Sequence, residues 1–154
     1  MKTTVLALAL AAVLVGTPMP AGTAADPASE VIALERKALD GLAQGSPDAL
    51  LAVCDADLSY FHVMTNGRLD GAPAVKSLVE PYRGRSLFES YEMIQPRVQA
   101  SGDVAVLTYV LVQRNGGAAA RWNGTQVYQR KAGGWRIIHT HWSQTDGNTG
   151  SRQP

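Results

Sequence analysis

Two of the three histidines, His139 and His141, stand two residues apart in the segment WRIIHTHWS, residues 135–143. A histidine exchanges a proton near neutral pH, and its neutral ring also binds transition metals. Side chains two apart in a β-strand point to the same face of a sheet. The pair therefore allows three interpretations: a metal site, an acid/base pair in a pocket, or polar groups held in the packed interior.

A metal site would need a third protein ligand. His62 is the only other histidine, and no Cys, Asp or Glu flanks the pair to complete a ligand shell. Catalytic zinc normally takes three protein ligands with further hydrogen-bonding support around them. The sequence thus predicts no metal and no cofactor.

In the acid/base interpretation, His139 and His141 are the catalytic candidates, acting on a bound organic molecule. Polar and aromatic side chains elsewhere would orient that molecule. The ligand-binding candidates are Tyr60, His62, Tyr109, Thr125, Gln126 and Trp135. In the third interpretation, the histidines are buried groups satisfied by partners such as Ser143 or Thr125, and the domain serves assembly alone.

The elements that must position these residues follow from periodicity and turn signals. Apolar residues at helical spacing after Asp26-Pro27, and again after Ser46-Pro47, predict two helices, and a third spans about 71–82. A strand is expected at 57–64, leading into an Asn66-Gly67 turn. Four longer strands are expected at 86–100, 104–113, 120–130 and 135–144, with Pro96 at a bulge or edge.

This order predicts an α+β domain in which a curved, antiparallel sheet forms a cone around the N-terminal helices. A pocket is expected between the first helix and the concave face of the sheet. One domain should span residues 26–145, followed by a polar, disordered tail at 146–154.

Residues 1–25 have the three-part pattern of a secretory signal peptide: Lys2, a short apolar run, and small residues before a cleavage site after Ala24 or Ala25. The apolar run is too short to anchor the chain in a membrane. The sequence therefore predicts a periplasmic or secreted protein. Cys54 is the only cysteine, so no internal disulfide is expected.

The charge balance narrows the class of partner. Without Lys2, the 14 Lys and Arg residues become 13, matching the 13 Asp and Glu residues. Nucleic acids and anionic membranes are bound through basic patches, which a balanced chain does not favour.

The C-terminal half carries a recognisable pattern: Gly102-Asp103 before an apolar strand, Thr125-x-Val127-Tyr128, Gly134-Trp135 and His139-x-His141-x-Ser143. It resembles the SnoaL-like branch of the nuclear transport factor 2-like superfamily, and most closely the calcium/calmodulin-dependent protein kinase II association domain and its bacterial relatives. The resemblance implies a cone-shaped fold, self-association as a homodimer or larger oligomer, and a last strand whose Trp135, His139 and His141 face the concave side.

The chain also departs from the family. Where the kinase association domain has pocket arginines, Leu111 and Gln126 stand here, so an anion-binding pocket is not expected. The strands at 104–113 and 120–130 contain no Asp or Glu, which argues against a carboxylate base. Three functions remain open: binding of a small, largely apolar molecule, an isomerase or cyclase using a pocket histidine, and an oligomerisation module without a ligand.

Overall fold

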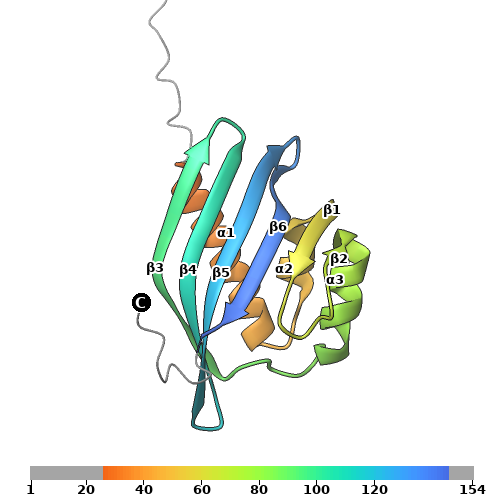
Figure 1. Ribbon diagram of the computed structural model, residues 1–154, viewed down its shortest axis with the longest axis vertical. Coiled ribbons are helices and arrows are strands. Elements are labelled where there is room, and N and C mark those ends of the chain that lie inside the picture. Colours follow the sequence, from red (N-terminus) through yellow and green to blue (C-terminus); the bar gives the residue numbers. More distant parts are fainter. Residues whose placement is uncertain (1–25, 146–154) are drawn as a thin grey trace, which may run out of the picture.

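The computed structural model in Figure 1 describes residues 26–145, one α+β domain of three helices and a curved sheet. The predicted signal peptide and the predicted C-terminal tail lie outside the described residues. Within the described part of the chain, no helix is long and apolar enough to cross a membrane.

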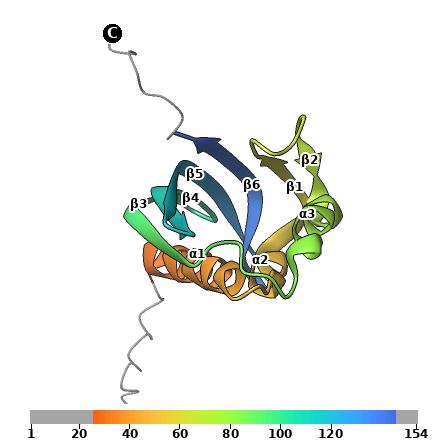
Figure 2. The ribbon, with the colours of Figure 1, turned by 90° about the horizontal axis from the view of Figure 1, so that it is seen from below.

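Helix α1 (Pro27–Ala43) begins where Asp26 accepts a hydrogen bond from the backbone N–H of Ser29 at 3.2 Å. An aspartate in this position satisfies a backbone donor that the first helical turn leaves unpaired. The helix buries Val31, Glu35, Ala38 and Leu39 against the sheet. It is the long helix beneath the strands in Figure 2.

Polar contacts hold α1 near both of its ends. Glu30 accepts hydrogen bonds from Trp135 Nε1 at 2.7 Å and from the Arg130 guanidinium at 2.5 Å. Toward the other end, Tyr91 Oη donates to Asp40 at 2.7 Å. These contacts fix which helical face is turned toward the concave side of the sheet.

Shorter elements close one side of the domain. Helix α2 (Asp48–Val53) leads directly into β1 (Cys54–Phe61), and a loop joins β1 to the two-residue strand β2 (Leu69–Asp70). Helix α3 (Gly71–Val79) and a 3₁₀ turn (Glu80–Tyr82) follow. In Figure 2 the helices α1, α2 and α3 lie on the concave side of the sheet, of which β1 and β2 are part.

The four long strands β3 (Ser90–Ser101), β4 (Val104–Asn115), β5 (Ala118–Lys131) and β6 (Gly134–Gln144) pair antiparallel in sequence order. The sheet as a whole has the order β2-β1-β6-β5-β4-β3. Strand β1 pairs with β6 in parallel, so the sheet is mixed rather than wholly antiparallel. This parallel pairing places the early strand beside the histidine-bearing strand.

Two β-bulges interrupt the long strands. In β3 the register shifts between Ile94 and Arg97, around Pro96, where a bulge or an edge was predicted. Gln95 in this bulge has a φ of 48°. In β6, His139 pairs with Val127 and Ile137 with Tyr128, which leaves Ile138 as an extra residue. A bulge of one residue reverses the face to which all later side chains point.

Candidate functional site

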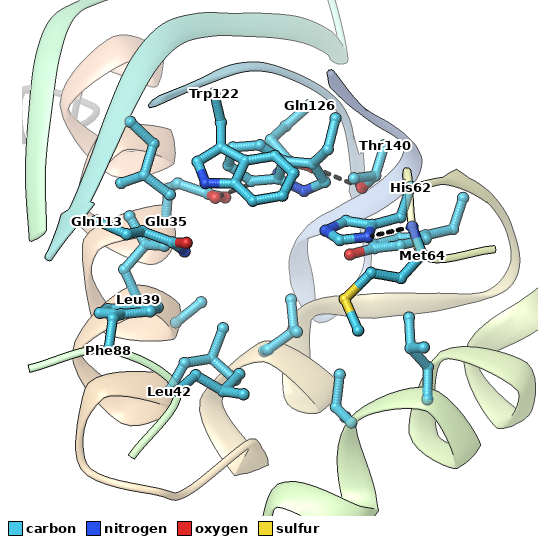
Figure 3. A pocket seen from close by; sticks show the side chains of 18 of the residues that line it. Glu35, Leu39, Leu42, His62, Met64, Phe88, Gln113, Trp122, Gln126 and Thr140 are labelled. Atoms are coloured by element: carbon cyan, nitrogen blue, oxygen red, sulfur yellow. Dashed lines mark hydrogen bonds between the residues drawn. The ribbon is translucent and has the colours of Figure 1, made fainter. Parts of the chain in front are cut away.

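A cavity of about 280 Å³ lies between the helices and the concave face of the sheet. Figure 3 shows Leu39, Leu42 and Phe88 along one side and His62 and Met64 on the other, with Trp122, Gln126 and Thr140 above them. Most of the lining side chains are apolar. A few polar groups among apolar walls are typical of pockets that bind small molecules.

Glu35 supplies the only carboxylate among the residues that line the cavity. It is 2% exposed, and its two oxygens accept hydrogen bonds from Tyr109 Oη at 2.5 Å, Tyr128 Oη at 2.6 Å and Gln126 Nε2 at 3.2 Å. Thr140 Oγ1 donates in turn to Gln126 Oε1 at 2.5 Å. Burial raises the pKa of the Glu35 carboxyl, and the three hydrogen bonds oppose that rise.

The sequence interpretation did not include Glu35 as a site residue. The sequence did contain an indication that Glu35 is buried. Glu35 lies four residues after Val31 and four before Leu39, and both of these apolar residues of α1 are buried. Residues four apart in a helix share a face. A carboxylate in the middle of such an apolar face must be buried and therefore needs polar partners.

His62 lies across the cavity from α1, just after the end of β1. Its ring stacks on the indole of Trp122 with centroids 5.3 Å apart, and its centroid lies 6.1 Å from that of the Tyr60 ring. The His62 Nδ1 atom accepts a hydrogen bond from the backbone N–H of Met64 at 3.2 Å. Burial lowers the pKa of His62, which favours the neutral imidazole.

The structure places three predicted ligand-binding residues, Tyr60, His62 and Gln126, in the lining of this cavity. Tyr109 is buried on the same face and reaches the cavity through its hydrogen bond to Glu35. Trp135 is also buried on the concave side, but it is held by Glu30 and is not part of the lining.

The prediction that His139 and His141 face the concave side is wrong, and Thr125 also lies on the opposite face. The cavity is lined from β6 by Thr140 and Trp142. Simple alternation holds for Trp135 and Ile137, both buried, but the bulge at Ile138 turns the histidines outward.

On the convex face, His139 Nδ1 is hydrogen-bonded to Ser59 Oγ at 2.8 Å. The ring of Phe61 lies 6.1 Å from that of His139 and 5.8 Å from that of His141. Burial, and then the neighbouring His141, lower the pKa of His139. An acid/base enzyme built on the cavity would therefore have to use His62 or Glu35 instead of this pair.

Electrostatics limit what the cavity can hold. Its lining contains no Lys or Arg. Leu111 and Gln126, which stand where the kinase association domain has pocket arginines, both border the cavity. Within residues 26–145, no group of three or more His, Cys, Asp or Glu side chains is placed to hold a metal ion. The arrangement suits an uncharged molecule with a largely apolar body.

The sequence pattern of the calcium/calmodulin-dependent protein kinase II association domain matches residues 27–146. A comparison with curated protein sequences gave no match.

Several solved structures share the fold. A Parabacteroides distasonis protein, provisionally assigned as a ketosteroid isomerase, is 28% identical with a TM-score of 0.70, covering 79% of this chain and 90% of its own. A nuclear transport factor 2-like protein of unknown function from Pseudomonas putida is 24% identical with a TM-score of 0.68, and the match covers 75% of this chain and 84% of that protein. The calcium/calmodulin-dependent protein kinase II hub of S. rosetta is 25% identical with a TM-score of 0.66, and the match covers 80% of this chain and 100% of the hub chain.

Proposed function

The chain belongs to the calcium/calmodulin-dependent protein kinase II association-domain family, and from that premise we propose that it binds a small, uncharged, largely apolar molecule in the cavity beside α1. The family and fold alone do not choose a function, because the same scaffold carries different sites. The choice has to come from the cavity and the chemistry of its lining.

The cavity beside Glu35 is the observation that carries this proposal. A filled cone would leave no room for a ligand, whereas about 280 Å³ remains open here between apolar walls. The carboxyl of Glu35 and the amide of Gln126 supply fixed polar groups at one end. Apolar walls with a few oriented polar groups give affinity through burial and selectivity through hydrogen bonding.

Binding of an uncharged, solvent-sensitive naphthalene ketone dye, measured by its fluorescence, tests the proposal. The variant Leu42→Trp fills the cavity from α1 and should abolish the saturable signal. The matched control Val104→Trp adds the same side chain at a position that is 38% exposed on the opposite face, and should leave it unchanged. Saturable binding that survives in a folded Leu42→Trp protein would exclude this cavity as the site.

Self-association is the second candidate function, favoured by the family and by the convex face of the sheet. Val104 and Phe61 are 38% and 39% exposed, and Val106 and Val110 lie half-buried on the face opposite the buried Ala105 and Tyr109. Exposed apolar residues grouped on one face are characteristic of protein interfaces. Sedimentation of the wild-type protein and of Val106→Asp should show an assembly that this charge dissociates; a monomeric wild type would remove this candidate.

A further inference from the structure

The indole nitrogen of Trp122 is the one buried side-chain N or O atom between residues 26 and 145 that has no hydrogen-bond partner. Trp122 lies on β5, and its ring borders the cavity. The indole nitrogen of Trp135, by contrast, has a partner: it donates a hydrogen bond to the Glu30 carboxylate at 2.7 Å. The Trp135 donor is thus paired within the fold, and the Trp122 donor is not.

An unpaired donor in the interior is costly. Burying an N–H without an acceptor loses the hydrogen bond that it would make with water, and native proteins rarely leave such a group unpaired. The Trp122 nitrogen is buried, so bulk water does not reach it. An acceptor that enters the cavity would recover this lost hydrogen bond.

The surroundings of Trp122 allow that acceptor to reach it. The ring is only half-buried and borders the cavity, while its nitrogen is screened. An acceptor in the cavity therefore reaches the nitrogen only if the indole rotates toward the open space. Stacking on His62 supports one face of the ring. Figure 3 shows the amide of Gln113 also turned into the cavity, and Leu39 and Phe88 below it.

We propose that the Trp122 N–H is the ligand anchor of the cavity, and that the ligand carries a neutral oxygen acceptor, such as a ketone, on a flat apolar body. The inference rests on the proposed binding function and names the chemistry of its ligand. A carboxylate would suit the indole donor too, but it would enter a cavity with no Lys or Arg and with the Glu35 carboxyl already present. A buried anion without a cationic partner is strongly disfavoured.

Two probes of matched shape separate the acceptor from the apolar body: 2-acetylnaphthalene, and 2-isopropenylnaphthalene, in which a CH₂ group replaces the carbonyl oxygen. The ketone should bind about tenfold more tightly, as expected for one added buried hydrogen bond. In ¹H–¹⁵N spectra, the ketone alone should move the Trp122 indole proton downfield. The Trp135 indole proton, already paired with Glu30, should not move. The anion 2-naphthoate should not bind.

Paired variants complete the test. Trp122→Phe keeps an aromatic ring but removes the donor, so the preference for the ketone should fall to about one. Trp135→Phe makes the same change outside the cavity and should keep the preference. Because the readout is a ratio of two affinities in one protein, a modest loss of stability does not mimic the result.

The contrary outcomes are distinct. If neither naphthalene binds the wild-type protein, the proposed function fails and the anchor with it. If both bind equally and the Trp122 proton does not move, the cavity binds apolar molecules but the anchor is overturned. A Trp122 proton that is already downfield in the free protein and shifts in Gln113→Leu would show that Gln113 pairs with the indole, which also overturns the anchor.

Discussion

Glu35 shows how one buried side chain can shape both the stability and the chemistry of this domain. Its carboxyl accepts hydrogen bonds from Tyr109, Tyr128 and Gln126, which come from two neighbouring strands. The group thereby ties α1 to β4 and β5. The same carboxyl reaches the cavity, so any ligand that fills the cavity meets a carboxyl whose pKa is raised by burial.

Replacement of Glu35 by Leu should destabilise the protein by about 3 kcal/mol, because three buried donors lose their acceptor together. Glu35→Gln keeps the size and one carbonyl oxygen, so it should cost about 1 kcal/mol under mildly acidic conditions. Urea unfolding followed by circular dichroism gives both values. Equal stability of the Leu variant and wild type would show that the three donors do not depend on this carboxyl.

The pH dependence of unfolding isolates the charge on Glu35. Since burial raises the folded-state pKa of Glu35 above its ordinary value of 4.5, Glu35 in the unfolded chain loses its proton first as pH rises. The wild type should therefore lose stability as pH rises from about 4.5 toward the raised pKa. Glu35→Gln has no such loss at this site, so the stability gap between the two proteins should narrow toward neutral pH, and a constant gap would contradict the raised pKa.

Strands β5 and β6 depend on a close contact between Gly124 and Trp142. A Cβ atom on Gly124 would lie 2.7 Å from the Trp142 ring, and that ring both lines the cavity and packs edge-on against Tyr109 at 5.6 Å. A glycine within a strand commonly marks such a close approach. The small residue on β5 thus determines where an aromatic wall of the cavity can lie.

We expect Gly124→Ala to destabilise the protein by about 1–3 kcal/mol, the usual cost of overpacking, and to displace the Trp142 ring into the cavity. Gly67→Ala is the matched control, because a Cβ there meets nothing within 4 Å; its effect should stay within about 0.5 kcal/mol. Thermal unfolding and dye binding measure both consequences. Unchanged stability in Gly124→Ala would mean that the ring moves aside freely.

The two bulges explain which elements could be predicted from sequence and which could not. Proline cannot donate a ladder hydrogen bond, so Pro96 marked the bulge in β3 in advance. The bulge in β6 falls at Ile138, next to Ile137, and no glycine or proline marks it. Period-two counting therefore found the strand, but it put His139 and His141 on the same face as Trp135, the face that the resemblance placed on the concave side; the bulge separates them.

The approximate position of the cavity could also be predicted from periodicity. Periodicity located α1 and the long strands, and Tyr60, His62 and Gln126 were expected near a concave surface that the cavity occupies. Glu35 and Trp122 were not expected there, because their roles depend on what each polar atom meets. Partners such as Tyr128, 93 residues away from Glu35, become neighbours only in the folded sheet.

At the scale of the whole molecule, the sheet separates two surfaces with different proposed uses. The concave side holds the cavity and His62, while the convex side carries His139 and His141 beside the exposed Phe61. The three histidines therefore report on opposite faces of one sheet. A ligand in the cavity and a second copy on the convex face should perturb different histidines.

Histidine titration by NMR should distinguish these two events. Burial already lowers the pKa of His62, and a neutral ligand that excludes more water should lower it further while leaving the pKa of His139 unchanged. By linkage, ligand affinity should fall as the solution is acidified through the lowered pKa, because the imidazolium cannot keep its hydration in a filled cavity. Dilution of an assembled protein should instead move the His139 and His141 signals. A ligand that shifts the convex pair and leaves His62 unchanged would place its binding site on the other side of the sheet.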